Sequence, residues 1–320
     1  AVLTKKVFQG VAVRILFDPV GSFSGLGWRY LRKARAAGIE IRPFSALWRI
    51  HTISYRNHRK IAVIDGAVGF TGGLNIGNEH LDPPLGFARW RDTHIRLTGS
   101  AVWSLQSVFL IDCANATDEV LDPASLFPAV TQEDHAANLA VQICLSGPDT
   151  EYAAIRQLYF ELIVSAKSQV LIQSPFFILD ETLAEALKLK ALSGVDVQVM
   201  ISPKGPGQFL PYWAANTYAI DVARAGVKVH HYSAGYLHAK TVCVDGEVSS
   251  IGSANWDIRS FSINYELTAV IYDKDVSQQL MAAFKNDLGD CVAFDLTQYQ
   301  RQGRLLRFRD SLARLASPLL

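Results

Sequence analysis

A repeated set of polar residues constrains this chain more than any apolar pattern. Residues 57–75 read NHRKIAVIDGAVGFTGGLN, and residues 237–255 read LHAKTVCVDGEVSSIGSAN. A repeat kept only for folding needs to preserve only its apolar positions, so repetition of the polar ones indicates shared chemistry. The matched pairs, each separated by 180 residues, are His58 and His238, Lys60 and Lys240, Asp65 and Asp245, Gly72 and Gly252, and Asn75 and Asn255.

Short β-branched runs alternate with helical patterns along the whole chain, which predicts an α/β fold. The sequences that flank the two motifs are also similar, as in QGVAVRI and SGVDVQV. We therefore predict two related halves, residues 1–132 and 133–320. The boundary is expected in the polar, proline-containing stretch 117–137. Strands are expected at 11–17, 39–44, 61–64, 93–98, 170–177, 195–201, 227–232, 241–244 and 266–272, and helices at 27–38, 101–116, 152–166, 182–193 and 212–225.

The repeat further predicts that the first half is incomplete. In the second half, a strand at 170–177 and a helix at 182–193 precede the strand at 195–201. In the first half, only ten residues precede the equivalent Val11, and the sequence begins with Ala rather than Met. We therefore expect the first half to lack one strand, and the parent protein to continue upstream.

Composition narrows the classes of function. The 31 basic and 30 acidic side chains give a net charge of +1, which argues against a protein whose main task is to hold nucleic acid on a basic face. The four cysteines form no CxxC pair, so buried thiols are expected rather than a disulfide framework or a zinc site. No stretch has the roughly 18 uninterrupted apolar residues of a membrane-spanning helix.

The motif itself predicts phosphate chemistry. Residues i and i+2 of a strand point to one face, so His58 and Lys60 present an imidazole and an ammonium side by side. If pseudo-twofold symmetry brings the halves together, one histidine attacks a phosphorus in line while the other protonates the leaving oxygen. No metal is required for this reaction. The non-bridging oxygens would be neutralised by Lys60, Lys240, Asn75 and Asn255.

The twin HxKxxxxD motifs, followed by GGLN and GSAN, resemble the phospholipase D superfamily. Together with WRDTHIRLTG, NWDIRSFSINYEL and the C-terminal RFRDSLARLASPLL, they resemble bacterial cardiolipin synthases over nearly the whole chain. The resemblance implies two pseudo-symmetric α/β/α sandwich halves with the active site at their interface. It also implies that two phosphatidylglycerol molecules are converted to cardiolipin and glycerol through a phosphatidyl-histidine, without a cofactor.

The resemblance also assigns roles. It implies His58 as nucleophile and His238 as acid and base, although sequence symmetry leaves the order open. Asp65 and Asp245 belong to the motif and are expected to orient side chains or turns. The family's NxE triplet falls on Asn264 and Glu266, which implies that Glu266 orients an imidazole. Asp92 is expected to stand in for Glu266 in the first half, and Ser253 fits the family's phosphate-binding GSxN, where the first half has Gly73.

Family members of this type carry N-terminal membrane helices, so a peripheral position at the bacterial cytoplasmic membrane is expected, with anionic phospholipid rather than nucleic acid as partner. Residues 205–218 and 81–90 combine turn residues with aromatics; they either flank a lipid entrance or belong to the core. Two other functions stay open, namely hydrolysis of a phosphodiester and a catalytically silent phosphate- or lipid-binding scaffold. The oligomeric state is open as well.

Overall fold

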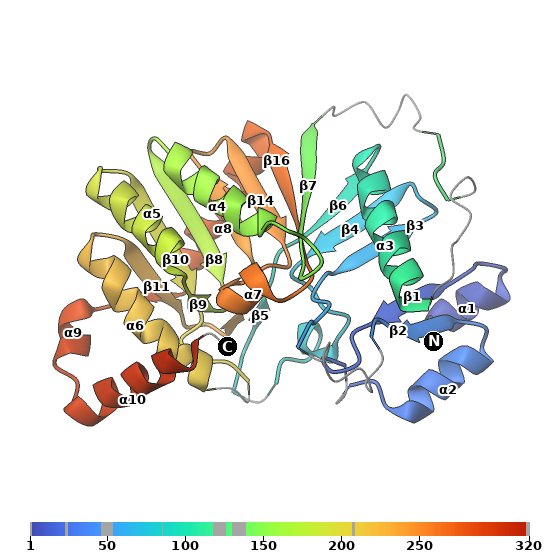
Figure 1. Cartoon of the computed structure of the whole chain (residues 1–320), viewed down its shortest axis with the longest axis horizontal. Coiled ribbons are helices and arrows are strands. Elements are labelled where there is room, and N and C mark those ends of the chain that lie inside the picture. The colour runs from blue at the N-terminus through green and yellow to red at the C-terminus, as the bar shows by residue number, and fades with distance from the viewer. Residues whose placement is uncertain are drawn as a thin grey trace.

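The computed structural model describes residues 2–22, 25–45, 54–84, 86–117, 126–129, 139–206 and 209–317. Two α/β halves lie side by side, with the first half at the right of Figure 1 and the second at the left. The candidate domain boundary at residues 132 and 133 lies outside the described residues and stays a prediction.

The second half is built on an eight-stranded sheet in the order β17-β11-β10-β8-β13-β14-β16-β7. Its strands are β7 (Ala140–Ser146), β8 (Gln169–Ser174), β10 (Asp196–Ile201), β11 (Lys228–Tyr232), β13 (Thr241–Val244), β14 (Val248–Gly252), β16 (Glu266–Tyr272) and β17 (Cys291–Ala293). Strands β8, β10 and β11 are parallel, and the other pairs are antiparallel.

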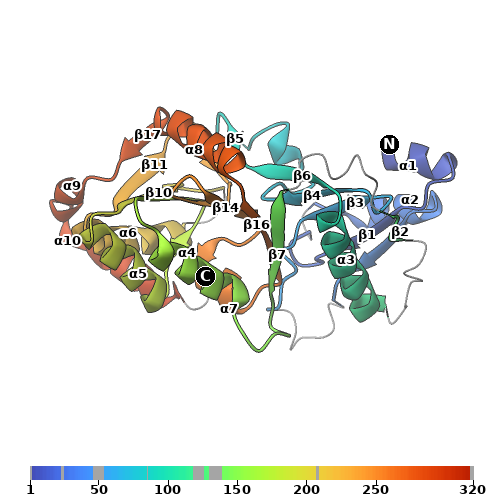
Figure 2. The ribbon, with the colours of Figure 1, turned by 90° about the horizontal axis from the view of Figure 1, so that it is seen from above.

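Helices cover both faces of this sheet, as Figure 2 shows. One face carries α4 (Ala154–Ser165), α5 (Glu181–Leu192) and α6 (Leu210–Arg224), and the other carries α8 (Lys274–Leu288). The chain then ends in α9 (Leu296–Gln300) and α10 (Arg304–Leu315), beside α6. Short elements near the interface complete the half: β9 (Phe177–Ile178), β12 (Tyr236–Leu237), β15 (Trp256–Asp257) and α7 (Ile258–Ser262).

The first half repeats part of this plan in two separate sheets. A parallel pair contains β1 (Arg14–Phe17) and β2 (Glu40–Pro43), and an antiparallel sheet contains β3 (Ile61–Ile64), β4 (Val68–Gly72) and β6 (His94–Thr98). The remaining elements are α1 (Val2–Phe8), α2 (Trp28–Ala36), the 3-10 turn at Asn78–His80, β5 (Trp90–Arg91) and α3 (Ala101–Thr117).

The separation of the two sheets has a direct counterpart in the second half. There β8 lies between β10 and β13, whereas in the described part of the first half no strand lies between β1 and β3. As a result β3 has an open edge: Ile64 is 54% exposed, while the equivalent Val244 is 5% exposed.

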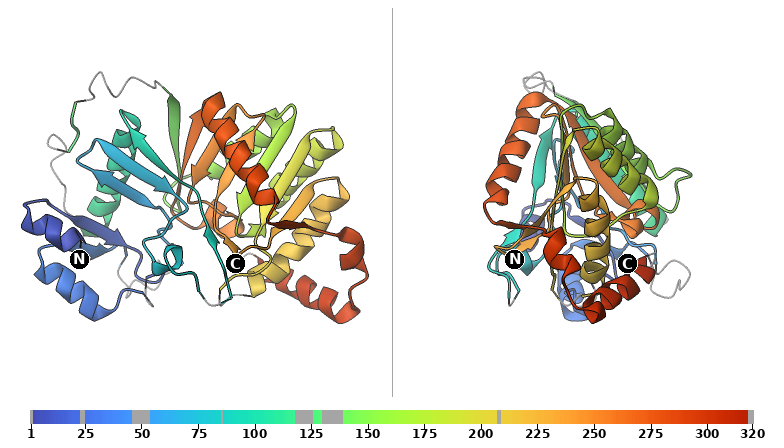
Figure 3. Two further views of the ribbon diagram at one scale, coloured as in Figure 1. Left: turned by 180° about the vertical axis from the view of Figure 1, so that it is seen from behind. Right: turned by 90° about the vertical axis from the view of Figure 1, so that its left-hand side faces the viewer.

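An apolar layer joins the halves. Leu105 and Val108 of α3 pack against Leu267 of β16, so one buried cluster contains side chains from both halves. The partly buried members of the same cluster are Ile61, Val63, Leu97, Ile143 and Leu145. Burial of this layer removes apolar surface from water and fixes the two sheets relative to each other. Figure 3 shows the same pairing of the halves from behind.

The aspartates of the two motifs form matching turns. Asp65 and Asp245 have φ of 53° and 54°, and the following glycines have φ of 65° and 66°, as a type I′ hairpin turn requires. The Asp245 carboxylate accepts hydrogen bonds from three backbone N–H groups of residues 167–169, each 2.8 Å long, at the start of β8. No hydrogen bond of the Asp65 carboxylate is seen to a described residue, because the first half has no counterpart of that segment there.

This difference predicts unequal effects of one substitution. Asp245→Ala removes the acceptor of three backbone hydrogen bonds and is expected to lower the free energy of unfolding by about 1–3 kcal/mol more than Asp65→Ala. Both alanines would have to adopt nearly the same positive φ, so the conformational free energy of that backbone geometry is equal in the two variants and cancels in the comparison. Urea unfolding of the two variants measures the difference, and equal losses would contradict it.

Candidate active site

The two motif histidines are anchored by backbone hydrogen bonds that cross between the halves. His58 lies just before β3, and its N–H donates to the carbonyl of Tyr265 in the second half at 2.9 Å. His238 lies just before β13, and its N–H donates to the carbonyl of Arg91 in the first half at 2.7 Å. Each histidine is therefore held by the half that does not contain it.

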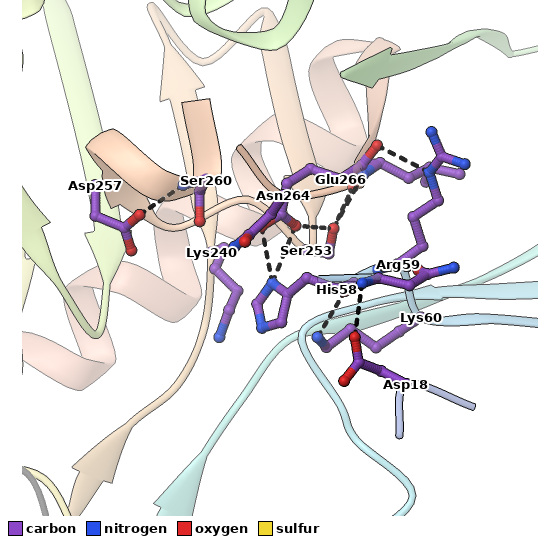
Figure 4. A network of polar contacts seen from close by, with 12 residues as sticks. Asp18, His58, Arg59, Lys60, Lys240, Ser253, Asp257, Ser260, Asn264 and Glu266 are labelled. Atoms are coloured by element: carbon purple, nitrogen blue, oxygen red, sulfur yellow. Dashed lines mark hydrogen bonds and ion pairs between the residues drawn. The ribbon is translucent and has the colours of Figure 1, made fainter. Parts of the chain in front are cut away.

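The imidazoles follow the same rule. Nδ1 of His58 lies 2.9 Å from a carboxylate oxygen of Glu266, and Nδ1 of His238 lies 2.7 Å from one of Asp92. Both carboxylates are almost wholly buried, with side-chain exposures of 0% and 3%. A proton on Nδ1 satisfies each carboxylate and leaves Nε2 of each ring with a free lone pair. Figure 4 shows the His58–Glu266 pair.

Strand register makes Asp92 the equivalent of Glu266. Gly72 pairs with His94 in the first half, and Gly252 pairs with Thr268 in the second, so each carboxylate lies two residues before the matched partner. The first half lacks the NxE triplet, and its carboxylate nevertheless has the same position and the same task. The sequence expectation that Asp92 stands in for Glu266 agrees with this placement.

The difference between Gly73 and Ser253 follows from these carboxylates. Ser253 is fully buried, and its hydroxyl donates to Glu266 while accepting the N–H of Leu267. A Cβ on Gly73 would lie 1.9 Å from the Asp92 carboxylate, so no side chain fits there. Ser253, expected from sequence to bind phosphate, lies behind Glu266 and supports it.

Two lysines complete the cluster, of which Lys240 is 1% exposed and Lys60 is half-buried. Lys60 Nζ donates to the carbonyl of His58 at 2.6 Å, and Lys240 makes the matching bond to His238. Burial lowers the pKa of Lys60 to about 8 and that of Lys240 to about 7, because an ammonium loses hydration inside the protein. Figure 4 shows the His58 side chain between those of the two lysines.

The imidazoles are neutral in the ligand-free protein. Burial, followed by the charge of Lys240, lowers the pKa of His238 to about 3. Burial also lowers the pKa of His58, against the opposing charge of Glu266. Each lysine acts on the histidine of the other half as well as its own, so the four groups face one space. An anion bound there would raise all four pKa values and stabilise the charged forms.

The motif aspartates are not part of this cluster. Asp65 and Asp245 lie five residues after the lysines, at the far ends of β3 and β13, which places them about 16 Å away at the usual strand rise. The asparagines also differ from each other. Asn75 is exposed, whereas Asn255 is 6% exposed and its Oδ1 has no hydrogen-bond partner among the described residues.

Sequence reasoning missed several supporting side chains. Arg59 forms a buried ion pair with Asp112 of α3 at 2.7 Å, and Arg91 forms a partly exposed ion pair with Asp287 of α8 at 2.9 Å. These ion pairs hold the loops beside each histidine. In the sequence, Arg59 directly follows His58, and Arg91 directly precedes Asp92.

An aromatic wall also surrounds His238. The rings of Trp90, Tyr236 and His80 lie 5.5, 5.8 and 6.4 Å from its imidazole, measured between ring centroids. Nothing in the local sequence links His80 to residue 238.

The described residues were also considered for metal-binding groups and membrane-spanning helices. No group of three or more His, Cys, Asp or Glu side chains there is arranged to hold a metal ion. None of the described helices combines the length and apolar character needed to cross a bilayer.

Comparison with known proteins now adds to this geometry. A family model described as "Cardiolipin synthase, PLD-like domain" matches residues 1–83 and 159–288. The chain belongs to this family. It is 43% identical over 323 residues to a cardiolipin synthase of Geobacillus thermodenitrificans (strain NG80-2), covering 100% of this chain and 64% of that protein. It is 40% identical to the major cardiolipin synthase ClsA of Bacillus subtilis (strain 168), covering 99% and 66%.

The chain thus spans slightly less than two-thirds of the length of each of these two curated relatives. Among solved structures, phosphatidylserine synthase of Haemophilus influenzae Rd KW20 superposes with a TM-score of 0.66 at 16% identity, covering 96% of this chain and 83% of that one. This likeness concerns the fold and confirms the α/β class expected from the sequence, and the family model gives the phospholipase D-like assignment.

We expect the free energy of unfolding to increase when the buried lysine of the second half is replaced by an apolar residue. Lys240→Met replaces a buried ammonium by an apolar side chain and is expected to raise the free energy of unfolding at pH 7 by about 1–3 kcal/mol. In the parent, the folded lysine releases its proton near pH 7 and the unfolded one near pH 10.5, so stability rises with pH between these values. Urea unfolding at pH 7 and pH 9 measures both effects.

Exposed Lys33→Met is the control and is expected to change neither quantity. An unchanged pH slope or a loss of stability in Lys240→Met would contradict the assignment of Lys240 as a strained, buried cation.

Proposed function

We propose that the chain transfers a phosphatidyl group from one phosphatidylglycerol to the hydroxyl of another, forming cardiolipin and releasing glycerol. The observation that carries the proposal is the pair of histidine–carboxylate contacts: in each, the histidine comes from one half and the carboxylate from the other, and both lysines lie beside them. Two equivalent imidazoles allow one to attack phosphorus while the other handles protons. The printed names of the family and of the relatives favour the same reaction.

In the first step Nε2 of His58 attacks the phosphorus, and the bond between phosphorus and the glycerol oxygen breaks. His238 gives its Nε2 proton to that oxygen, so glycerol leaves as the neutral alcohol. His238 must take up this proton as the substrate binds, since its pKa is about 3 without ligand. The phosphodiester anion supplies the required rise in pKa, and Lys60 and Lys240 neutralise the non-bridging oxygens.

In the second step the hydroxyl of another phosphatidylglycerol loses its proton to His238 while its oxygen attacks the phosphorus. The bond between phosphorus and Nε2 of His58 breaks, and the free imidazole is restored. Glu266 and Asp92 keep each ring in the required tautomer and stabilise the positive charge that forms on it. All bonds made and broken involve only side chains and the two lipids, so no cofactor takes part.

The substrates place this reaction at the surface of the bacterial cytoplasmic membrane. Phosphatidylglycerol is a bilayer lipid, so the site must reach headgroups at an anionic surface. Hydrolysis differs from this reaction only in the acceptor, because water discharges the same intermediate.

The test is incubation with phosphatidylglycerol vesicles in the presence of EDTA, with analysis of lipids and free glycerol. We expect cardiolipin and glycerol in equal amounts, and a loss of at least about 10³-fold in His58→Ala and in His238→Ala. Mass spectrometry of the parent protein, quenched during turnover, is expected to find a phosphatidyl adduct on His58, and neither variant is expected to carry it. Phosphatidic acid as the product would replace transfer by hydrolysis, and full activity in either variant would overturn the proposal.

A further inference from the structure

The C-terminal helix α10 points to a second lipid-contacting feature, away from the histidines. We propose that α10 lies in the surface of an anionic phospholipid bilayer, with lipid headgroups in the arginine-lined groove beside it. The choice of lipid rests on the proposed function, while the contact itself is argued from the helix.

One face of α10 is fixed to the protein by polar and aromatic contacts. Asp310 is fully buried and accepts hydrogen bonds from Asn216 of α6 and Tyr299 of α9, at 3.0 and 2.8 Å. The guanidinium of Arg309 lies 4.6 Å from the ring centre of Trp213 in α6. These contacts set the rotation of the helix and so decide which side chains face outward.

The outward face is apolar. Leu305, Phe308, Leu312 and Leu315 are 80%, 65%, 56% and 78% exposed. They recur at intervals of three and four residues, so they form one stripe along the helix. The helix therefore turns an apolar stripe to water, whereas its buried positions are Asp310 and Ala313. No described residue covers this stripe.

Uncompensated positive charge lies next to the stripe. A groove of about 560 Å³ between α6, α9 and α10 is lined by Arg224, Arg304 and Arg307, together with Phe308. No ion pair joins these three arginines to any acidic side chain in the described residues. The chain as a whole has a net charge of only +1, so the concentration of cations here is local. Guanidinium groups suit the bidentate binding of phosphate oxygens.

An apolar stripe bordered by arginines matches a bilayer surface, where acyl chains receive the stripe and anionic headgroups meet the cations. A second copy of the chain fits less well. A twofold interface through α10 would place the same patch on both partners and oppose Arg304 and Arg307 to their own copies. The lipid surface supplies the missing negative charge, and we therefore choose it as the occupant.

The position of α10 in the fold supports this orientation. Figure 1 shows α10 at the lower left of the molecule and α2 at the lower right, with β5 between them; β5 contains Arg91, whose carbonyl accepts the N–H of His238. Helix α2 also exposes aromatic and basic side chains: Trp28 and Tyr30 are 63% and 50% exposed, and Arg29 and Arg32 stack on Trp28. A bilayer along this edge would meet both helices and the site together.

The experiment measures binding to vesicles by co-sedimentation. The vesicles contain phosphatidylcholine alone or an equal mixture of phosphatidylcholine and phosphatidylglycerol. Leu305→Glu/Leu312→Glu and Arg304→Glu/Arg307→Glu are each expected to weaken binding to the mixed vesicles at least about tenfold. The control Leu189→Glu/Leu192→Glu changes two leucines of α5 that are 60% and 74% exposed and is expected to bind like the parent.

A second measurement separates this inference from the proposed function. Turnover of a short-chain phosphatidylglycerol dissolved as monomers needs no bilayer, so the α10 variants are expected to keep parental rates, which also shows that they are folded. If no variant and no parent turns over that lipid while vesicle binding still depends on α10, the proposed function fails and the bilayer contact stands.

Unchanged vesicle binding in both α10 variants would overturn the inference. So would light scattering that shows a parental dimer becoming monomeric in these variants without a loss of vesicle binding, because a second copy would then be the occupant.

Discussion

The exchange of hydrogen bonds between the halves is the constraint on which the site depends. Neither half holds its own histidine: the carboxylate for His58 comes from β16, and that for His238 comes from the loop before β6. The backbone N–H groups of both histidines cross in the same way. The apolar layer of α3, β3, β7 and β16 therefore has a chemical role, since any slippage between the halves would separate both pairs at once.

This arrangement concentrates groups that destabilise a fold when they stand alone. Two lysines and two carboxylates lie around the imidazoles, and all four lose hydration there. At Glu266 and Asp92 the neighbouring cations and hydrogen bonds outweigh that loss, so the pKa of each carboxyl is lowered. At the two lysines the loss of hydration prevails and lowers their pKa values. Under the proposed function, a phosphodiester anion bound beside the lysines would offset this cost, so the cluster favours binding more than folding.

Sequence reasoning succeeded where local pattern and repetition decide the structure. Strands 61–64, 241–244 and 266–272 coincide with the observed β3, β13 and β16, because each is a β-branched run ended by turn residues. The equivalence of Asp92 and Glu266, which was expected from the sequence, has its physical basis in strand register, and no local pattern shows that register. The sequence groups Asp65 and Asp245 with the motif, and strand direction places them far from the histidines. The docking of α10 on α6 rests on contacts more than 80 residues apart in sequence, which no local pattern reveals.

The most direct test of the crossed pairing is nitrogen NMR of the protein labelled with ¹⁵N at histidine. The account predicts that His58 and His238 both carry their proton on Nδ1 at neutral pH. It further predicts that Glu266→Gln perturbs the nitrogen signals of His58 alone, and that Asp92→Asn perturbs those of His238 alone. Perturbation of the histidine within the same half, or of both rings equally by either variant, would contradict the exchange between halves.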